Sequence, residues 1–283
     1  MPRRNCRDVN DITLAQLEAA RAHRWRTEPA RRISTEREAL RFIRELGFVI
    51  LVPVSGAELP SIHAACGEGW GVWWDWKQTL PERRACYYSH LLRARGTFLA
   101  WEWFAPFYAA YGEARTYHQL FRDGRLDRAE KEVLDLLSSR GPMMTREVRL
   151  AYAPRSKENT RRVKQVLVDL QGRFLICAAG GTTEGWSHHR WDLVSRWVAP
   201  EHLLSARALS RDEARRRLLA QQIRNSLAPT EADLAWLFGW PRAEVHSLIA
   251  LVVEDGEAER VVAPELEGEV LVPRPWPAKG RGL

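Results

Sequence analysis

The order of predicted elements between residues 126 and 194 restricts the fold of this chain more than any other feature. Apolar residues at helical spacing, a Gly141-Pro142 stop and a Ser156 N-cap set the boundaries. The pattern predicts helices at 126–140, 145–153 and 157–170, then strands at 174–178 and 186–194. Helix, short helix, basic helix and glycine-rich hairpin is the order of a winged helix-turn-helix, which we predict over residues 118–202.

The same order returns towards the end of the sequence. The pattern there predicts helices at 211–226, 230–238 and 241–254, then strands at 259–263 and 270–272. We therefore predict a second winged helix with a basic tail at 203–283. A Trp-rich region at 1–117 begins with helices at 12–26 and 34–46 and a strand at 48–54, as a divergent third copy would. The predicted fold class is α+β and mostly helical, built from tandem winged helix-turn-helix units.

Two further stretches of the Trp-rich region are helical in pattern. We expect a helix over 80–95 and an aromatic helix over 98–111. Gln221 and Gln222 lie together on the predicted 211–226 helix, where such a pair is typical of a solvent-exposed face.

The charge balance favours a polyanionic partner. The formal net charge is +7 and the sequence pI about 9.5, with arginine preferred over lysine. Nucleic acid is the commonest polyanion, although arginine enrichment across a whole proteome gives the same balance. The four cysteines form no CxxC pair, so we expect reduced thiols, no disulfide framework and no metal or other cofactor.

The sequence shows no targeting or membrane signal. The first residues lack the apolar core of a signal peptide, and no apolar run approaches the roughly 20 residues of a membrane helix. We expect a cytoplasmic monomer that does not contact membranes.

The third helix of the 118–202 unit is the clearest binding element. Such a helix typically enters the major groove while the wing follows the backbone. The predicted contacts to double-stranded DNA lie on this helix and on the wing: Lys157, Arg161, Arg162, Lys164, His188, His189 and Arg190. A solvated face on a winged helix that binds proteins is the alternative. His188 and His189 point to opposite sides of a strand, so we expect no metal site there.

Residues 67–77 (GEGWGVWWDWK) gather four tryptophans among glycines. Aromatic rings of this kind wedge into a duplex or hold an extruded base. The predicted base pocket or wedge comprises Trp73, Trp74, Trp76 and Tyr87, with Lys77 as a further DNA contact. The alternative is a tryptophan-packed core with Asp75 at its rim.

Several segments together resemble one family. They are Leu46-Gly47-Phe48-Val49, Trp191-Asp192-Leu193 with Arg196-Trp197, and Ala232-Asp233-Leu234 with Pro241-Arg242-Ala243-Glu244-Val245. Their order is similar to that in the AlkZ/YcaQ-like winged-helix DNA glycosylases. The Trp74-Asp75-Trp76-Lys77, Leu80-Pro81 and Tyr87-Tyr88 stretch resembles the AlkZ-related subgroup. The resemblance extends loosely over most of the chain.

This resemblance implies excision of a bulky base without a metal, by water attack on the anomeric carbon. Family members use a Gln-x-Gln or Gln-x-Asp motif at positions that are Ile50 and Val52 here, and neither side chain can orient water. If catalysis is retained, nearby carboxylates must act, and we predict Glu58 and Asp75.

Two functional hypotheses follow. The first is a monofunctional DNA glycosylase that removes an alkylated, crosslinked or hypermodified base and leaves an abasic site, in repair or anti-phage defence. The second is a non-catalytic winged-helix DNA-binding protein, a regulator or damage sensor.

Overall fold

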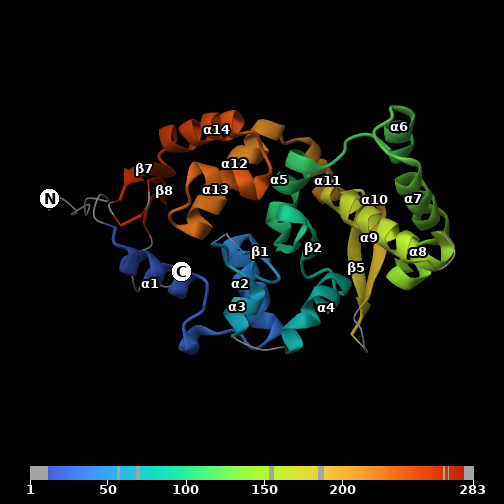
Figure 1. Ribbon diagram of the computed structural model, residues 1–283, viewed down its shortest axis with the longest axis horizontal. Helices are drawn as coiled ribbons and strands as arrows, with labels where there is room; N and C mark the ends of the chain where they lie inside the picture. The colour runs from blue at the N-terminus through green and yellow to red at the C-terminus, as the bar shows by residue number, and fades with distance from the viewer. Residues whose placement is uncertain are drawn as a thin grey trace. The chain divides into compact units, whose positions relative to one another are not determined.

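The computed structural model describes residues 12–55, 58–67, 71–152, 156–183, 188–263, 265–266 and 268–276 (Figure 1). The chain divides into two compact units. The central unit comprises Ser34–Val52 and Gly69–Ala214, and the terminal unit comprises Met1–Ile33, Pro53–Glu68 and Arg215–Leu283. Helices dominate both units and the sheets are small and antiparallel, so the predicted α+β, mostly helical class is confirmed. The division into three tandem winged helices stays a prediction.

The central unit contains most of the regular elements. In chain order they are α2 Glu36–Leu46, β1 Phe48–Ile50, η3 Val72–Trp74, α4 Trp76–Glu82, β2 Tyr87–His90, η4 Leu92–Ala94, β3 Gly96–Leu99, α5 Trp101–Tyr111, α6 Tyr117–Arg122, α7 Arg128–Arg140, β4 Met143–Met144, α8 Thr145–Tyr152, α9 Lys157–Gly172, β5 Ile176–Thr182, β6 His188–Leu193, α10 Val194–Trp197 and α11 Pro200–Arg207. Helix α12, Arg211–Ser226, runs across the boundary into the terminal unit.

Local capping signals set where several helices begin. Thr35 and Glu38 form a capping box before α2, and Asp127 with Glu130 does the same before α7. The Ser156 side chain accepts a hydrogen bond from the Asn159 N–H and so opens α9. Each cap satisfies N–H groups that have no partner within the helix, which fixes the first turn.

Two three-stranded sheets lie in the central unit. The first has the order β1-β3-β2, and the second has the order β4-β6-β5. Between Ala178 and Gly181 the β5–β6 register shifts, and beyond this irregularity Gly181 faces His189. Helices α7, α8 and α9 precede the β5–β6 hairpin and contact it (Figure 1), which is the predicted order with the short strand β4 added.

The helix predicted over 80–95 is wrong. Helix α4 ends at Glu82, and the chain then forms β2, whose register pairs Tyr87 with Leu99 of β3. Tyr87, Tyr88 and Ser89 are all buried. A strand buried on both faces loses the alternating pattern, and two adjacent tyrosines favour a strand on intrinsic preference.

Tyr87 lies in an aromatic core of the central unit. Its ring stacks on Phe174 at a centroid distance of 5.5 Å and meets Phe104 edge-on at 5.1 Å. Trp101 and Trp197 stack at 5.7 Å beside it. Offset and edge-on contacts of this kind add about 0.5–1.5 kcal/mol each to the burial of the rings. Much of the aromatic content of the 98–111 segment therefore stabilises this core.

The terminal unit combines segments from widely separated parts of the sequence. Besides most of α12 it contains α1 Leu14–Arg24, η2 Pro29–Arg31, α3 Ile62–Cys66, α13 Glu231–Phe238, α14 Arg242–Glu254, β7 Ala258–Val262 and β8 Glu269–Pro273. Its apolar core includes Leu17, Leu227, Val261 and Val272. Trp25 Nε1 donates to the Asn225 carbonyl at 2.8 Å and fastens the end of α1 to α12.

The expectation that Gln221 and Gln222 lie on a solvent-exposed face is wrong. Both side chains are buried. Gln221 donates to the Asn225 side chain at 3.2 Å, and Gln222 donates to the Ser226 hydroxyl at 2.6 Å. Helix α12 is packed on several sides, so polar residues one turn apart satisfy each other inside the unit. In the described part of the chain, no helix is long and apolar enough to cross a membrane.

Candidate functional site

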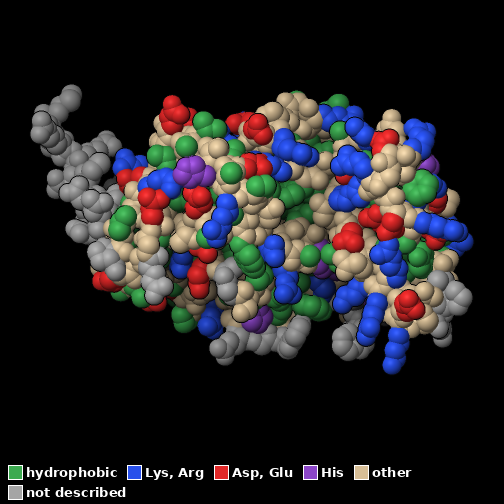
Figure 2. Space-filling model, turned by 45° about the horizontal axis from the view of Figure 1, so that its top comes forward, with side chains coloured by type: hydrophobic (Ala, Val, Ile, Leu, Met, Phe, Trp, Pro, Cys, Tyr) green, Lys and Arg blue, Asp and Glu red, His purple; other side chains and the backbone are tan. Residues whose placement is uncertain are grey.

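Helix α9 presents a row of cations to solvent. Val163, Val166 and Leu170 bury one face of this helix, so the other face is exposed. That exposed face carries Lys157, Arg161 and Lys164. Figure 2 shows Lys and Arg side chains projecting from the part of the molecule that contains α7 to α9. These three predicted DNA contacts are therefore placed where a phosphate backbone can reach them.

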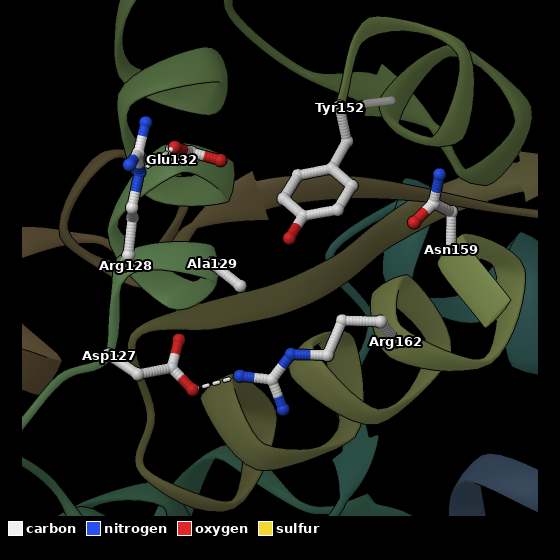
Figure 3. Close-up of a pocket in the computed structure, with 7 residues that line it drawn as sticks. All are labelled: Asp127, Arg128, Ala129, Glu132, Tyr152, Asn159 and Arg162. Atoms are coloured by element: carbon white, nitrogen blue, oxygen red, sulfur yellow. Dashed lines mark hydrogen bonds and ion pairs between the residues drawn. The ribbon is translucent and has the colours of Figure 1, made fainter. Parts of the chain in front are cut away.

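Arg162, predicted as a fourth contact on α9, is exposed but already pairs with a carboxylate of the same unit. Its guanidinium forms an ion pair with Asp127, the residue that caps α7. Both side chains line an open pocket of about 480 Å³ between α7, α8 and α9. In Figure 3 the Tyr152 hydroxyl points into this pocket from α8. Arg162 is therefore less available to a phosphate than its three neighbours on the helix.

The strand β6 separates the three predicted wing residues. His188 is exposed, whereas the ring of His189 is enclosed and packs against Tyr88 at a centroid distance of 5.5 Å. The two histidines thus face opposite sides, as the strand geometry predicts. Arg190 donates to Glu82 at 2.8 Å and to the Ala179 carbonyl at 3.3 Å. His188 therefore faces solvent, and Arg190 keeps a partly exposed side chain that is engaged by Glu82.

Two exposed arginines near α9 escaped the sequence analysis. Arg93 and Arg95 lie in the turn between β2 and β3, and β2 contacts α9. Burial lowers the pKa of His90 at the end of β2, and the charges of Lys164 and Arg95 act in the same direction. Lys164 and Arg95 therefore lie near one another. The mistaken 80–95 helix concealed this turn, whose signal is the Leu-Leu-Arg-Ala-Arg-Gly sequence before β3.

The predicted base pocket is mostly core. Trp73, Trp76 and Tyr87 are 4%, 3% and 0% exposed. A ring enclosed on all sides cannot stack on an extruded base, so for these three residues the alternative of a packed core describes the structure. Trp74 keeps partial exposure, as does Asp75 beside it. Contact with a base thus stays a prediction for Trp74 alone.

Lys77 is buried beneath Trp74, with an exposed fraction of 4%. Its Nζ lies 3.4 Å from the centre of the Trp74 ring and donates to the Trp74 carbonyl at 2.8 Å. Burial lowers the pKa of Lys77 to about 7, and the nearby Asp75 carboxylate only partly opposes this. The prediction that Lys77 contacts DNA phosphates is wrong for this conformation, because a phosphate cannot reach an enclosed amine.

Other buried and half-buried polar groups lie on α4 and on further elements of the same unit. Gln78, the next residue on α4, is 0% exposed, and neither polar atom of its amide has a hydrogen-bond partner among the described residues. A Cβ on Gly181 would lie 2.9 Å from Gln78 Cγ, so this glycine makes room for the glutamine. Gly181 faces His189, whose Nδ1 also lacks a partner in the described part of the chain.

The pKa of His189 is also lowered, mainly because this side chain is removed from water. Burial lowers it to about 3, with further contributions from the charges of His90 and Lys77. The imidazole is therefore neutral near pH 7. We call Lys77, Gln78, His90, Gln171 and His189 the Lys77 cluster. Buried polar groups without partners cost about 1–3 kcal/mol each, so such a cluster is characteristic of a functional site or of bound water.

Glu58 lies in the terminal unit. Its side chain is 70% exposed, and Oε2 is 3.7 Å from Arg21 Nη1. It lines a pocket of about 90 Å³ together with Gln222, Ser226 and Asp233. Asp75 belongs to the central unit, where it precedes α4 without capping it. The two predicted carboxylates are thus components of different compact units.

Comparison with known proteins identifies the family. The family model described as AlkZ related matches residues 33–239, which is most of the chain. The chain belongs to the AlkZ-related family. Among solved structures it is similar to the DNA glycosylase AlkZ of Streptomyces sahachiroi, with a TM-score of 0.56 and 17% sequence identity. The similarity covers 93% of this chain and 70% of that one, and shows a shared fold. No curated protein sequence matches the chain.

In this AlkZ-related chain, apolar residues occupy the two positions at which the family resemblance implies the Gln-x-Gln or Gln-x-Asp motif. Ile50 is 2% exposed and pairs with Thr97 of β3, and Val52 follows just after the strand. Gly47, which precedes β1, has a φ of +78° and lies against Trp103, where an added Cβ would be 2.4 Å from Nε1. The Leu46-Gly47-Phe48-Val49 segment therefore forms the expected helix end and strand, but carries no polar group at position 50 or 52.

Proposed function

We propose that this AlkZ-related protein is a DNA glycosylase that removes a bulky modified base from double-stranded DNA and leaves an abasic site. The observation that carries the proposal is the family match over 33–239, supported by a fold shared with a DNA glycosylase over 93% of the chain. Alkylated, crosslinked and hypermodified bases are the substrate classes. The first two imply DNA repair, and the third implies defence against phage with modified genomes.

The exposed cations of the central unit support DNA as the partner. Lys157, Arg161 and Lys164 on α9 and Arg93 and Arg95 on the β2–β3 turn project into solvent. Cations spaced along a helix and a turn can neutralise several phosphates of one duplex, which accounts for affinity without sequence readout. A glycosylase that recognises damage in any sequence needs this kind of contact.

For the chemistry we propose Glu58 and Asp75 as the carboxylates. Hydrolysis requires a group that accepts a proton from water as the water oxygen attacks C1′ and the base leaves with the bond electrons. Glu58 is exposed, and its Oε2 lies 3.7 Å from Arg21 Nη1. Asp75 lies next to the partly exposed Trp74, where a base could stack.

The second candidate function is DNA binding without catalysis. This function is favoured by Ile50, which is buried and has no polar side-chain atom to orient water. Ile50 stands where the family resemblance implies the first glutamine of the catalytic motif. This function requires the α9 cations but neither carboxylate.

Mass analysis of released bases separates these functions. The full chain is incubated with alkylated DNA, with crosslinked duplexes and with hypermodified phage DNA, and free bases are quantified. We expect release from one of these classes and alkali-sensitive sites in the same strand. Glu58→Gln and Asp75→Asn are the test variants. Glu28→Gln and Asp123→Asn, both partly exposed carboxylates elsewhere, are the matched controls.

The outcomes are distinct. Loss of base release in a test variant, with release kept in its control and DNA binding unchanged, supports the assigned carboxylate. Release that survives both test variants means that other groups catalyse it. Tight, salt-sensitive binding without any release, from any of the three substrates, leaves the DNA-binding function in place of the glycosylase.

A further inference from the structure

Helix α2 presents a second row of cations in the central unit. The helix contacts β1 and β3, and its buried face consists of Ala39, Phe42, Ile43 and Leu46. The other face carries three exposed arginines, Arg37, Arg41 and Arg44. With about 3.6 residues per turn, these three positions lie within an arc of about 60° that is centred opposite the buried face. The arginines therefore form one row that faces away from the core.

The carboxylates of α2 do not neutralise this row. Glu36 accepts a hydrogen bond from the Thr79 hydroxyl and forms an ion pair with Arg83. Glu38 is held in the capping box at the start of the helix. Glu45 is exposed, so three arginines stand against one exposed glutamate on the solvent side of α2. In the part of the chain that the structure describes, none of the three arginines has an ion-pair partner.

The spacing of this row is that of the cations on α9. Residues 37, 41 and 44 are separated by four and then three positions, and so are residues 157, 161 and 164. At 1.5 Å per residue, each row is about 10 Å long. One strand of a DNA duplex places a phosphate at about every 3.4 Å of helix axis, so a row of this length can face about three phosphates. Both helices thus offer the same arrangement to a polyanion with regularly spaced charges.

We propose that the α2 row of Arg37, Arg41 and Arg44 binds the phosphate backbone of duplex DNA, as a contact surface in addition to α9. The choice of DNA as the polyanion rests on the proposed function, and the charge and length of the row fit it. A guanidinium presents several N–H donors in a planar fork that matches phosphate oxygens. Such contacts hold a duplex without reading its sequence.

Salt-dependent binding of an unmodified duplex to the full chain tests the row without any base excision. In Arg37→Gln/Arg41→Gln/Arg44→Gln, the slope of log K against log salt should fall by about 3, because three phosphate contacts are lost. The slope of the matched control should fall by less than about 1. This control removes the same charge from exposed arginines scattered over α6, α11 and α12: Arg122→Gln/Arg207→Gln/Arg211→Gln.

Protection from phenylglyoxal locates the contact in the wild type. This reagent modifies exposed guanidinium groups, and trypsin then fails to cleave at each modified arginine. We expect Arg37, Arg41 and Arg44 to react in the free protein and to be protected by a saturating unmodified duplex. Arg161 on α9 should behave in the same way, whereas Arg207 should react in both states.

The outcomes separate this inference from the proposed function. An unchanged slope in the α2 variant, or an equal fall in the control, overturns the proposal. If the α2 variant does not fold, as judged by its thermal melt, the protection pattern of the wild type decides. Protection of Arg161 with full reactivity of the α2 arginines refutes this inference alone, and the row is then a solvated helix face. Protection of both rows without base release from any modified DNA refutes the glycosylase alone.

Discussion

Helix α9 and the Lys77 cluster place positive or ionisable groups of the central unit in opposite environments. The cations of α9 are exposed, so they act through their charge over distances near the Debye length. The groups around Lys77 are enclosed, and burial changes their chemistry while hiding their charge. The comparison teaches that exposure, rather than residue type, decides which cations of this unit can attract DNA.

Removal of the exposed α9 charges is the change with the largest expected effect. In Lys157→Gln/Arg161→Gln/Lys164→Gln, DNA affinity at low salt should fall by roughly 10²-fold, because three phosphate contacts are lost. The slope of log K against log salt should fall by about 3. Fluorescence anisotropy across a salt series measures both. Arg128→Gln, an exposed cation on α7, serves as the control. An unchanged slope would place the DNA on another surface.

Two buried glutamines offer a sharper comparison within the core. Gln171 Oε1 accepts from the His90 N–H at 3.0 Å, and its Nε2 donates to the Leu167 carbonyl at 2.8 Å. Gln171→Leu should lower the free energy of unfolding by about 2–4 kcal/mol, because the His90 N–H and Ser89 hydroxyl lose their acceptor. Gln78→Leu should be neutral or stabilise by about 1 kcal/mol, because its amide has no such partner among the residues that the structure describes.

Urea titrations of both variants measure this difference. A Gln78→Leu variant as unstable as Gln171→Leu would mean that ordered water satisfies the Gln78 amide. A stabilised Gln78→Leu variant that also loses base release would show that the Gln78 amide serves function at the expense of stability.

Acid stability reports on His189. The folded-state pKa is lowered from 6.5 to about 3, so between these values the unfolded chain binds a proton that the folded chain does not. The contribution of His189 to stability is therefore complete above pH 6.5 and is lost as the pH falls towards 3. In His189→Phe this part of the pH dependence should disappear. Thermal melts from pH 4 to 8 measure it, and His188→Phe, an exposed neighbour, should keep the wild-type profile.

Arg162→Gln gives the smallest expected effect. Because its guanidinium is held by Asp127, we expect DNA affinity to fall by less than about threefold, with little change in the salt slope. Titrations alongside Arg161→Gln, its exposed neighbour, provide the comparison. A larger loss for Arg162→Gln than for Arg161→Gln would mean that Arg162 exchanges Asp127 for a phosphate.

Where local signals decide the structure, the sequence predicts it well. The α7, α8 and α9 helices and the β5–β6 hairpin lie close to the predicted ranges, because caps such as Ser156 and breakers such as Gly141-Pro142 act over a few residues. The exposed positions of Lys157, Arg161 and Lys164 follow from the apolar spacing of the same helix.

The sequence does not predict structure that depends on contacts between distant segments. Strand β2 is a strand because β3 pairs with it and the aromatic core encloses Tyr87. Gln222 is buried because elements far along the chain surround α12. The environment of Lys77 depends on the fold of Trp74 over its own helix and on His189, more than 100 residues later.

The terminal unit also has a kinetic consequence. Arg21, Arg24 and Trp25 at the end of α1 hydrogen-bond to Asn225 and Ser226, about 200 positions later in the chain. At about 5–20 residues per second, a ribosome needs roughly 10–40 s to synthesise that interval. During this time α1 has no docking surface, and the whole central unit is made within the same interval. Nascent chains therefore pass through a stage in which the central unit can fold while the amphipathic helix α1 is still undocked. Chaperones can bind α1 at that stage.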